Sequence, residues 1–260
     1  MKAAFSKAQF EAEFSSRFGP AIKSRDKSIA SAIPTGISEV DDLTGGLPRG
    51  AVTEIYGVSS SGRTTLMLST LAEASNRDEV CAVIDTTDAF DPAAAQVVGT
   101  RLERVLWLRC GAILEHAFKA TDLLLQAGGF GLIFLDLGDV PARDSRRIIS
   151  SWWYRFRRVV ENTPTSFVVV AQDSCVRSCA SLTLETKNSA ELWSSTISRT
   201  IDLSSNSKPL AAAPHSESDS EGLPTHSRVL KGLHLTLHRQ KPVNLHDPIA
   251  TFKAALSCSH

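Results

Sequence analysis

The stretch EIYGVSSSGRTTL, residues 54–66, decides the fold that this sequence predicts. Its apolar start indicates a β-strand that ends at Tyr56, and Thr64 opens a helix. Between them, Gly57 and Gly62 frame four residues, as in the phosphate-binding loop G-x-x-x-x-G-K-[ST]. Backbone N–H groups and the helix N-terminus of such a loop face phosphate oxygens. The stretch therefore predicts a nucleotide site, and a Gly- and Ser-rich turn without a ligand is the alternative.

One position of the loop departs from the pattern, because Arg63 stands where the motif has Lys. A guanidinium is planar and bulkier than the compact Lys ammonium, so the exchange is not conservative. We expect weakened or altered nucleotide binding and poor catalysis. If a nucleotide binds, the Thr64 hydroxyl would ligate Mg²⁺. The loop residues expected to contact the nucleotide are Gly57, Ser60, Ser61, Gly62, Arg63, Thr64 and Thr65.

Short apolar runs alternate with helical patterns through residues 31–203. Strands are expected near 52–56, 80–84, 104–108, 131–136 and 166–171, and helices near 64–76, 90–99, 112–127 and 144–161. This order predicts an α/β fold with a mostly parallel sheet covered by helices, and a ligand site at the carboxyl ends of the strands. The run GLIFLD ends in Asp136, which has the form of a Walker B carboxylate and would hold Mg²⁺ through water. An Asp that only caps a loop is the alternative.

The rest of the chain divides by composition. Residues 204–227 are rich in Ser, Pro and Ala and predict a flexible loop. The alternating segment 228–238 is expected to pair with 196–204 as an antiparallel hairpin. Four aromatic residues spaced as on one helix face would pack on the main domain or dock on a neighbouring subunit: Phe5, Phe10, Phe14 and Phe18. The expected segments are 1–30 (N-terminal lead-in), 31–203 (core), 204–227 (flexible loop) and 228–260 (C-terminal strand and tail).

Composition excludes several classes of protein. The 28 basic and 28 acidic residues cancel, which excludes a polycation that coats nucleic acid by bulk charge. No apolar run approaches the roughly 20 residues of a membrane span. The five cysteines are odd in number and irregularly spaced, which fits a reducing compartment better than a disulfide framework. We therefore expect a cytoplasmic protein without a membrane partner.

The segment 33–66, IPTGISEVDDLTGGLPRGAVTEIYGVSSSGRTTL, resembles the start of the bacterial RecA recombinase core. CAVIDTTDAFDP (81–92) resembles the RecA segment after the first crossover helix. FVVVAQ (167–172) is similar to the strand that ends in the glutamine sensing the γ-phosphate, which adds Gln172 to the expected nucleotide site. The resemblance implies a RecA-like P-loop core with a C-terminal antiparallel hairpin. It also implies ATP and Mg²⁺ as cofactors and single-stranded DNA as a ligand.

The departures from that family fall on its nucleotide chemistry. The RecA catalytic Glu is matched by Thr87, which cannot act as a general base near neutral pH. Asp88, one position on, is a weak substitute, because one step along the backbone changes its direction. Ala94 matches the Tyr that stacks on adenine. Together with Arg63, these changes predict little or no ATP turnover.

The DNA-binding parts differ as well. Asp136 and Gln172 are 36 positions apart, so the first DNA-binding loop is expected to be largely missing, and the second would span 173–193. The stretch 143–158, RDSRRIISSWWYRFRR, contains six arginines and predicts one amphipathic helix. Its expected apolar arc consists of Ile149, Trp152, Trp153, Phe156 and Val160. A solvated basic face is the simplest interpretation, and contact with phosphates or an acidic partner is the functional one. The candidate DNA contacts are Arg143, Arg147, Arg158 and Arg177.

This pattern of losses resembles the reduced RecA-like proteins of the ImuA type. The resemblance implies an accessory protein of DNA repair and SOS mutagenesis that scaffolds a recombinase or a translesion polymerase, and that could form homo-oligomers. An active DNA-dependent ATPase and recombinase, using Arg63 and Asp88, is the alternative. A nucleotide-sensing module unrelated to DNA is a third interpretation.

Overall fold

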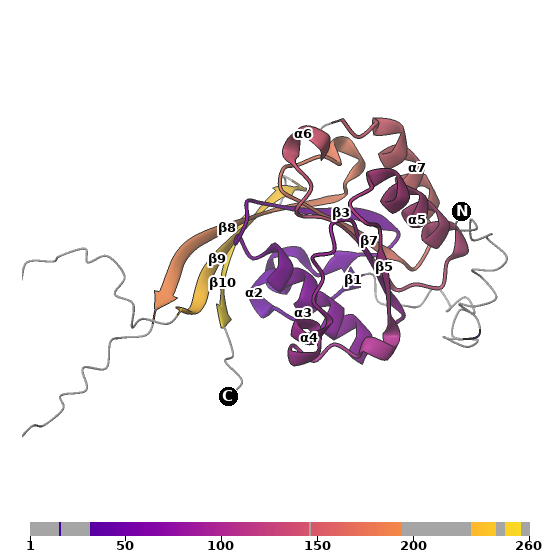
Figure 1. The fold of residues 1–260 in the computed structure, drawn as a ribbon. Helices are drawn as coiled ribbons and strands as arrows, with labels where there is room; N and C mark the ends of the chain where they lie inside the picture. The colour runs from indigo at the N-terminus through magenta and orange to yellow at the C-terminus, as the bar shows by residue number, and fades with distance from the viewer. Residues whose placement is uncertain (1–15, 17–31, 146, 194–229, 243–247, 256–260) are drawn as a thin grey trace, which may run out of the picture.

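A computed structural model describes residues 16, 32–145, 147–193, 230–242 and 248–255. The Phe stripe of the N-terminal lead-in, the loop at 204–227 and the segment 196–204 lie outside these residues. A large sheet forms the centre of the molecule (Figure 1). Its strands are β3 (Ala51–Tyr56), β4 (Cys81–Asp85), β5 (Val105–Arg109), β6 (Leu132–Leu137), β7 (Ser166–Ala171), β8 (Leu182–Trp193), β9 (Leu230–Lys241) and β10 (Ile249–Ala255). A second, two-stranded sheet pairs β1 (Ala32–Ile33) with β2 (Leu47–Pro48).

The large sheet has the order β10-β9-β8-β3-β7-β6-β4-β5. Strands β8 to β5 in this order run parallel, and β9 and β10 add antiparallel strands at one edge. Every residue of β4, β6 and β7 is buried, which is why these strands read as continuous apolar runs instead of alternating ones. The predicted α/β class, the parallel sheet and the C-terminal antiparallel hairpin are confirmed.

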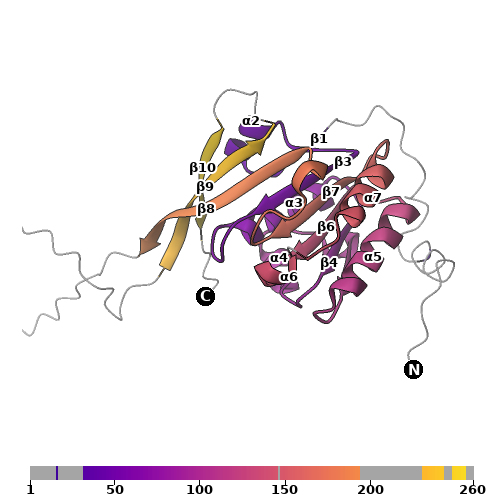
Figure 2. The same cartoon turned by 90° about the horizontal axis from the view of Figure 1, so that it is seen from above.

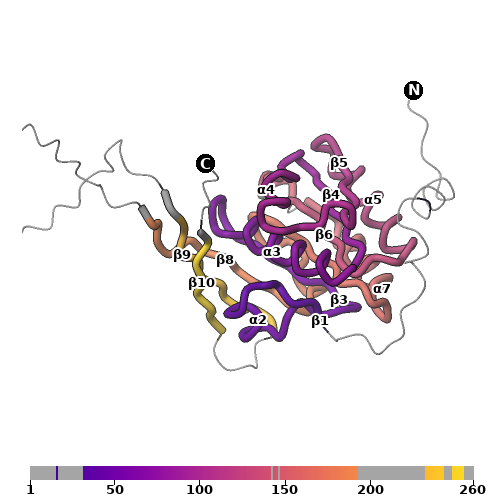
Figure 3. Tube along the Cα trace, turned by 90° about the horizontal axis from the view of Figure 1, so that it is seen from below, coloured from indigo at the N-terminus to yellow at the C-terminus, as the bar shows by residue number. Residues whose placement is uncertain are grey.

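Helices cover both faces of the sheet. They are α2 (Ser38–Thr44), α3 (Arg63–Asn76), α4 (Pro92–Val97), α5 (Leu114–Ala127), α6 (Ala142–Ser145) and α7 (Ser150–Val160), with 3₁₀ turns η2 (Leu102–Arg104) and η3 (Arg177–Cys179). Helices α5 and α7 cover one face, and α2, α3 and α4 cover the other (Figures 1 and 2). Strands β8, β9 and β10 extend away from this body, as Figure 3 shows. No helix in the described part is long and apolar enough to cross a bilayer.

The long helix expected over 144–161 is wrong, because the chain leaves the helical conformation between α6 and α7. Ile149 precedes α7 with extended backbone angles and is 67% exposed, so it does not belong to the buried apolar arc. Arg143 lies on α6, Arg147 lies in the connection, and Arg158 alone of these three lies on α7. The serines at 150 and 151 follow the break, and Ser favours helix starts over helix interiors.

Two expectations for the second half of the chain need correction, and one strand comes in addition. The segment 173–193 was expected as a loop, but its second part forms β8. Strand β9 pairs with β8 and β10, while 196–204 lies outside the described residues. The tail after Pro248 contains β10, which supplies the second strand of the hairpin. Leu182 and Leu184 of β8 are buried, and this apolar-polar alternation in LTLETK was the sequence signal for the strand.

The amino ends of the parallel strands are joined by a buried ion pair. Arg49, just before β3, donates to Glu79, just before β4, with an Nη1–Oε2 distance of 3.0 Å. The same Arg49 nitrogen donates to the carbonyl of Pro164, before β7. A Cβ on Gly131, before β6, would lie 1.7 Å from Glu79 Oε2, so only glycine fits there. This clamp ties together four strand starts.

Aromatic stacking under α7 predicts a strong contribution to stability. The fully buried Phe156 ring contacts Phe118, Trp152, Trp153 and Phe167. We expect Phe156→Ala to lower the free energy of unfolding by about 3–5 kcal/mol, because it opens a cavity in this cluster. Tyr154→Ala, on the exposed side of the same helix, is the control and should change it by about 0.5 kcal/mol or less. Urea unfolding measures both, and equal effects would contradict the packing described.

Candidate functional site

The predicted phosphate loop lies between β3 and α3, and its glycines are held by close contacts. A Cβ on Gly57 would lie 2.3 Å from the Thr186 carbonyl oxygen of β8. A Cβ on Gly62 would lie 2.4 Å from Leu235 Cδ1 of β9, and Gly62 has a left-handed φ of 95°. The Ser61 hydroxyl bonds to the Thr186 hydroxyl at 2.8 Å. Packing against β8 and β9 thus requires both glycines, whether or not the loop holds a phosphate.

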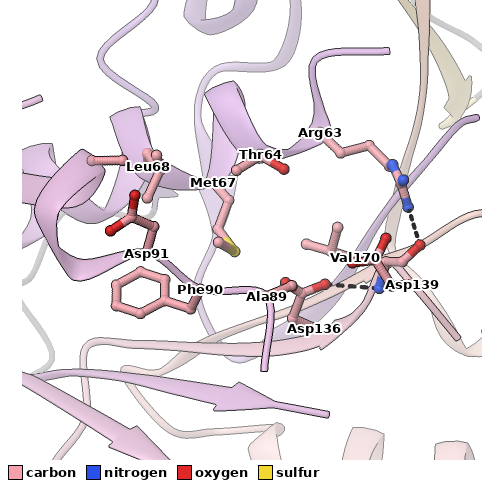
Figure 4. Close-up of a pocket in the computed structure, with 12 residues that line it drawn as sticks. Arg63, Thr64, Met67, Leu68, Ala89, Phe90, Asp91, Asp136, Asp139 and Val170 are labelled. Atoms are coloured by element: carbon pink, nitrogen blue, oxygen red, sulfur yellow. Dashed lines mark hydrogen bonds between the residues drawn. The ribbon is translucent and has the colours of Figure 1, made fainter. Parts of the chain in front are cut away.

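A small pocket, of about 80 Å³, adjoins the start of α3 at the carboxyl edge of the sheet (Figure 4). Ligand pockets usually measure roughly 300–1,000 Å³, so this one accommodates a phosphate group more readily than a whole nucleotide. Its lining residues are Arg63, Thr64, Met67, Leu68, Ala89, Phe90, Asp91, Ala94, Asp136, Gly138, Asp139 and Val170. It therefore brings together the predicted Arg63, Thr64 and Asp136, and includes Ala94.

Arg63 turns toward the end of β6 and not toward the solvent. Its side chain is 7% exposed, and Nη1 donates to the Gly138 carbonyl at 3.0 Å (Figure 4). Burial lowers the pKa of Arg63, against the opposing attraction of Asp136 and Asp139. The first residue of α3 is thus tied to the segment that follows the Walker B strand.

Asp136 is 8% exposed and lies within β6. Its Oδ1 accepts a hydrogen bond from the Gly138 N–H at 2.8 Å. Burial raises the pKa of Asp136 to about 6, although this hydrogen bond and the charge of Arg63 lower it. A Cβ on Gly138 would lie 2.9 Å from Asp136 Oδ1 and 3.2 Å from Arg63 Nη1, so the glycine permits both groups to approach.

These residues do not fit a Mg²⁺ site of the kind that the resemblance implies. Mg²⁺ requires near-octahedral oxygen ligands and keeps several waters. Here the Asp136 carboxylate is desolvated, already accepts a hydrogen bond, and faces the Arg63 cation. In the described ranges, no group of three or more His, Cys, Asp or Glu side chains could hold a metal ion. Thr64 and Asp136 both line the pocket, but the cation beside Asp136 is a guanidinium.

The loop after β4 is organised by Asp85, a residue that the sequence analysis missed. Its carboxylate accepts hydrogen bonds from the N–H groups of Asp88 (2.8 Å), Ala89 (3.0 Å) and Phe90 (3.0 Å). It also accepts one from Trp107 Nε1 at 3.1 Å. An acidic residue that ends a wholly buried strand was the available signal. This carboxylate shapes the wall of the pocket that Ala89 and Phe90 form.

The two residues considered in place of the catalytic Glu lie on this loop. The Thr87 hydroxyl is buried and has no hydrogen-bond partner within the described residues. The Asp88 carboxylate forms two hydrogen bonds with Arg109, which lower its pKa, and it does not line the pocket. Gln172 follows β7 and is half-buried, but is not among the lining residues either. Neither Thr87 nor Asp88 is placed to activate a water in this pocket.

Glu54 is a buried residue of β3 for which the sequence suggested no role. Its carboxylate accepts hydrogen bonds from the N–H groups of Cys175 (2.6 Å) and Val176 (2.7 Å), and from the Ser174 hydroxyl (2.8 Å). It therefore fixes the start of the segment that follows Gln172. Sequence reasoning could not find this contact, because two of the three donors are backbone groups 121 and 122 positions away.

All four candidate DNA contacts are exposed. Arg158 on α7 and Arg177 on η3 are brought near by a Tyr154–Ser178 hydroxyl contact of 3.4 Å. Arg143 pairs with Asp144 at 3.6 Å. Arg147, Arg158 and Arg177 have no ion-pair partner within the ranges that the structure describes, whereas Arg155, on the same helix, pairs with Asp122. The unpaired guanidinium groups on α7, on η3 and in the connection before α7 are thus available to an anionic partner.

Residues 8–143, more than half of the chain, match the family model described as the RecA N-terminal domain. The chain belongs to this family. Protein RecA of Brucella anthropi is 40% identical over 106 residues, which cover 40% of this chain and 29% of that protein. Protein RecA of Aquifex aeolicus is 30% identical over 167 residues, covering 58% of this chain and 48% of the relative. Protein RecA of a Methylobacterium species is 44% identical over 92 residues, covering 35% and 25%.

The chain therefore spans about half or less of the length of these RecA relatives. The family model covers the phosphate loop, the loop after β4 and Asp136, and with them every residue that lines the pocket except Val170. The predicted RecA-like core is confirmed. The departures expected from the resemblance, at Arg63, Thr87 and Ala94, all lie within the residues that the family model matches.

Loss of the Glu54 carboxylate should disturb the segment after β7 in particular. We expect Glu54→Ala to lower the free energy of unfolding by about 2 kcal/mol or more, because two buried N–H groups lose their acceptor. Hydrogen exchange at the amides of Cys175 and Val176 should speed up most. Glu73→Ala, which removes an exposed pair with Arg77, is the control and should cost less than about 1 kcal/mol. Unchanged exchange at 175 and 176 would contradict the role assigned to Glu54.

Proposed function

We propose that this chain is an ImuA-type accessory protein of DNA repair and SOS mutagenesis, in which a RecA-like core scaffolds a recombinase or a translesion polymerase. The observation that carries the proposal is the set of residues that line the pocket and the contacts that they make. The pocket keeps the phosphate loop and Asp136, but Arg63 is tied to Gly138, and neither Thr87 nor Asp88, the residues at and beside the position of the catalytic Glu, lines the pocket. Family membership supports a role in DNA metabolism, and the altered pocket supports an accessory role.

The chemistry of phosphoryl transfer explains why these changes matter. Hydrolysis needs positive charge placed on the transferred phosphoryl group and a group that orients the attacking water. Arg63 donates one of its hydrogen bonds to a backbone carbonyl. The Thr87 hydroxyl cannot accept a proton near neutral pH. Asp88, whose pKa is lowered by Arg109, is a weak base and is already paired. Each loss costs orders of magnitude in rate.

The exposed arginines on α7, η3 and the preceding connection support contact with the phosphates of single-stranded DNA or with an acidic partner. Arg147, Arg158 and Arg177 offer planar donor sets that match phosphate oxygens. The neutral net charge of the chain makes such local clustering meaningful. An active DNA-dependent ATPase and recombinase remains the second candidate function, since the loop and Asp136 are present.

An ATPase assay separates the two candidate functions. We expect no turnover above background, with or without single-stranded DNA and Mg²⁺, and no change on Asp136→Ala. The reason is that neither charge stabilisation nor water activation is in place. DNA-stimulated turnover that Asp136→Ala abolishes would overturn the accessory proposal and establish the motor.

Titration of labelled single-stranded DNA across salt concentrations tests the basic surface. Replacing Arg147 and Arg158 together with Ala should weaken binding about equally for all sequences and reduce the salt slope by about 1.4, since each lost phosphate contact contributes about 0.7. Replacing the ion-paired Arg77 and Arg101 with Ala is the matched control and should leave the slope unchanged.

An unchanged slope in the Arg147 and Arg158 variant would exclude this surface as the DNA contact. Absence of DNA affinity, together with no binding of a purified recombinase or translesion polymerase in pull-downs, would instead favour a nucleotide-sensing role unrelated to DNA.

A further inference from the structure

The pocket at the start of α3 is lined by a cationic side chain of the protein, Arg63. The Arg63 side chain lines the pocket, is almost fully buried, and is anchored by one hydrogen bond from Nη1 to the Gly138 carbonyl. Its Nε and Nη2 atoms have no hydrogen-bond partner among the residues that the structure describes. One end of the guanidinium is therefore fixed, and the remaining donors are left for a ligand.

Two of the three acidic residues that line the pocket lie close to this cation. Asp136 and Asp139 both line the pocket and both attract Arg63 electrostatically. Gly138 lies between them in sequence and lets the carboxylate of Asp136 and the guanidinium approach the same backbone. A divalent cation brought to Asp136 would be repelled by the guanidinium at close range in a desolvated site. It would also find Oδ1 of Asp136 already accepting from Gly138 N–H.

We propose that the Arg63 guanidinium is the resident cation of this pocket, compensating Asp136 and Asp139, and that the loop binds a di- or triphosphate group without a divalent metal ion. The inference deepens the proposed function, because it states which form of ligand the altered nucleotide site takes. A guanidinium donates two parallel hydrogen bonds to phosphate oxygens, and the N-terminus of α3 adds partial positive charge. The small volume of the pocket suits a phosphate group of the chain and not the nucleoside, so ATP and inorganic triphosphate share the chemistry that it recognises.

Equilibrium binding with and without metal tests the proposal. The full chain is titrated with ATP, and separately with inorganic triphosphate, in excess MgCl₂ or in EDTA. We expect the Kd of the unaltered protein to differ by less than about threefold between the two conditions, because no metal is part of the site. Binding of ATP alone identifies a nucleotide as the ligand, and binding of both identifies the phosphate chain; either result supports the proposal.

Two variants distinguish Arg63 from a general effect of charge. In Arg63→Lys, a compact ammonium replaces the planar fork that donates to the Gly138 carbonyl and leaves further donors for phosphate, so binding should come to depend on the metal ion and EDTA should weaken it by about tenfold or more. Arg77→Lys, the same exchange at the exposed end of α3, is the matched control and should behave like the unaltered protein. Asp136→Asn should leave affinity unchanged or increase it, because the carboxylate repels the ligand instead of carrying a metal. Circular dichroism checks that each variant is folded.

Three results would overturn the inference. They are a loss of about tenfold or more in the affinity of the unaltered protein in EDTA, a comparable loss in folded Asp136→Asn, or no binding of either ligand in any condition. None of these bears on the DNA titration, since those arginines lie on α7, on η3 and in the connection before α7. Failure of the metal-free site and failure of the proposed DNA-repair role are therefore separate outcomes.

Discussion

A guanidinium group buried at the carboxyl edge of the sheet determines what the site can hold. A buried charge is costly unless it is paired and hydrogen-bonded. Arg63 meets both conditions through the Gly138 carbonyl and the nearby Asp136 and Asp139. The same contacts join the start of α3 to the segment after β6, the two halves that a bound nucleotide would otherwise bridge. The arginine that stands at the lysine position of the motif thus links the start of α3 to the segment after β6.

The phosphate loop also has a structural role, which constrains its glycines whether or not a phosphate binds. Gly57 is required by the carbonyl of Thr186, and Gly62 by the side chain of Leu235. Both partners belong to strands that extend the sheet beyond the parallel core. The sequence motif alone could not distinguish a loop that binds phosphate from a tightly packed turn. The structure shows that the turn is tightly packed, whether or not it also binds phosphate. The position that differs from the motif is the one after Gly62, where Arg63 is buried and bonded to the Gly138 carbonyl.

The sequence predicted those parts of the fold that depend on local pattern. Buried parallel strands such as β6 and β7 are continuous apolar runs, and α3 and α5 have clear helical periodicity, so their positions were readable. The pocket residues Arg63, Thr64 and Asp136 followed from the motif and the strand end. The break before α7 was missed, because the arginines around it fit a helical pattern on both sides. The strand β8 was missed, because resemblance assigned its residues to a loop.

Residues whose partners are backbone groups far along the chain escaped prediction for a physical reason. Asp85 and Glu54 act through N–H groups that only the folded chain places beside them. No spacing or periodicity encodes such contacts. Asp85 nevertheless shapes the loop whose Ala89 and Phe90 line the pocket, and Glu54 shapes the segment that follows β7.

The clamp of Arg49, Glu79 and Gly131 has a consequence for how such a protein can change over time. It secures the strands at the edge opposite the pocket, far from the phosphate loop. The clamp that stabilises the fold and the residues that line the pocket therefore lie at opposite ends of the same β-strands. A lineage can discard an enzymatic activity at one pole while the architecture remains intact at the other, and the surviving framework is then available for a new, non-enzymatic use.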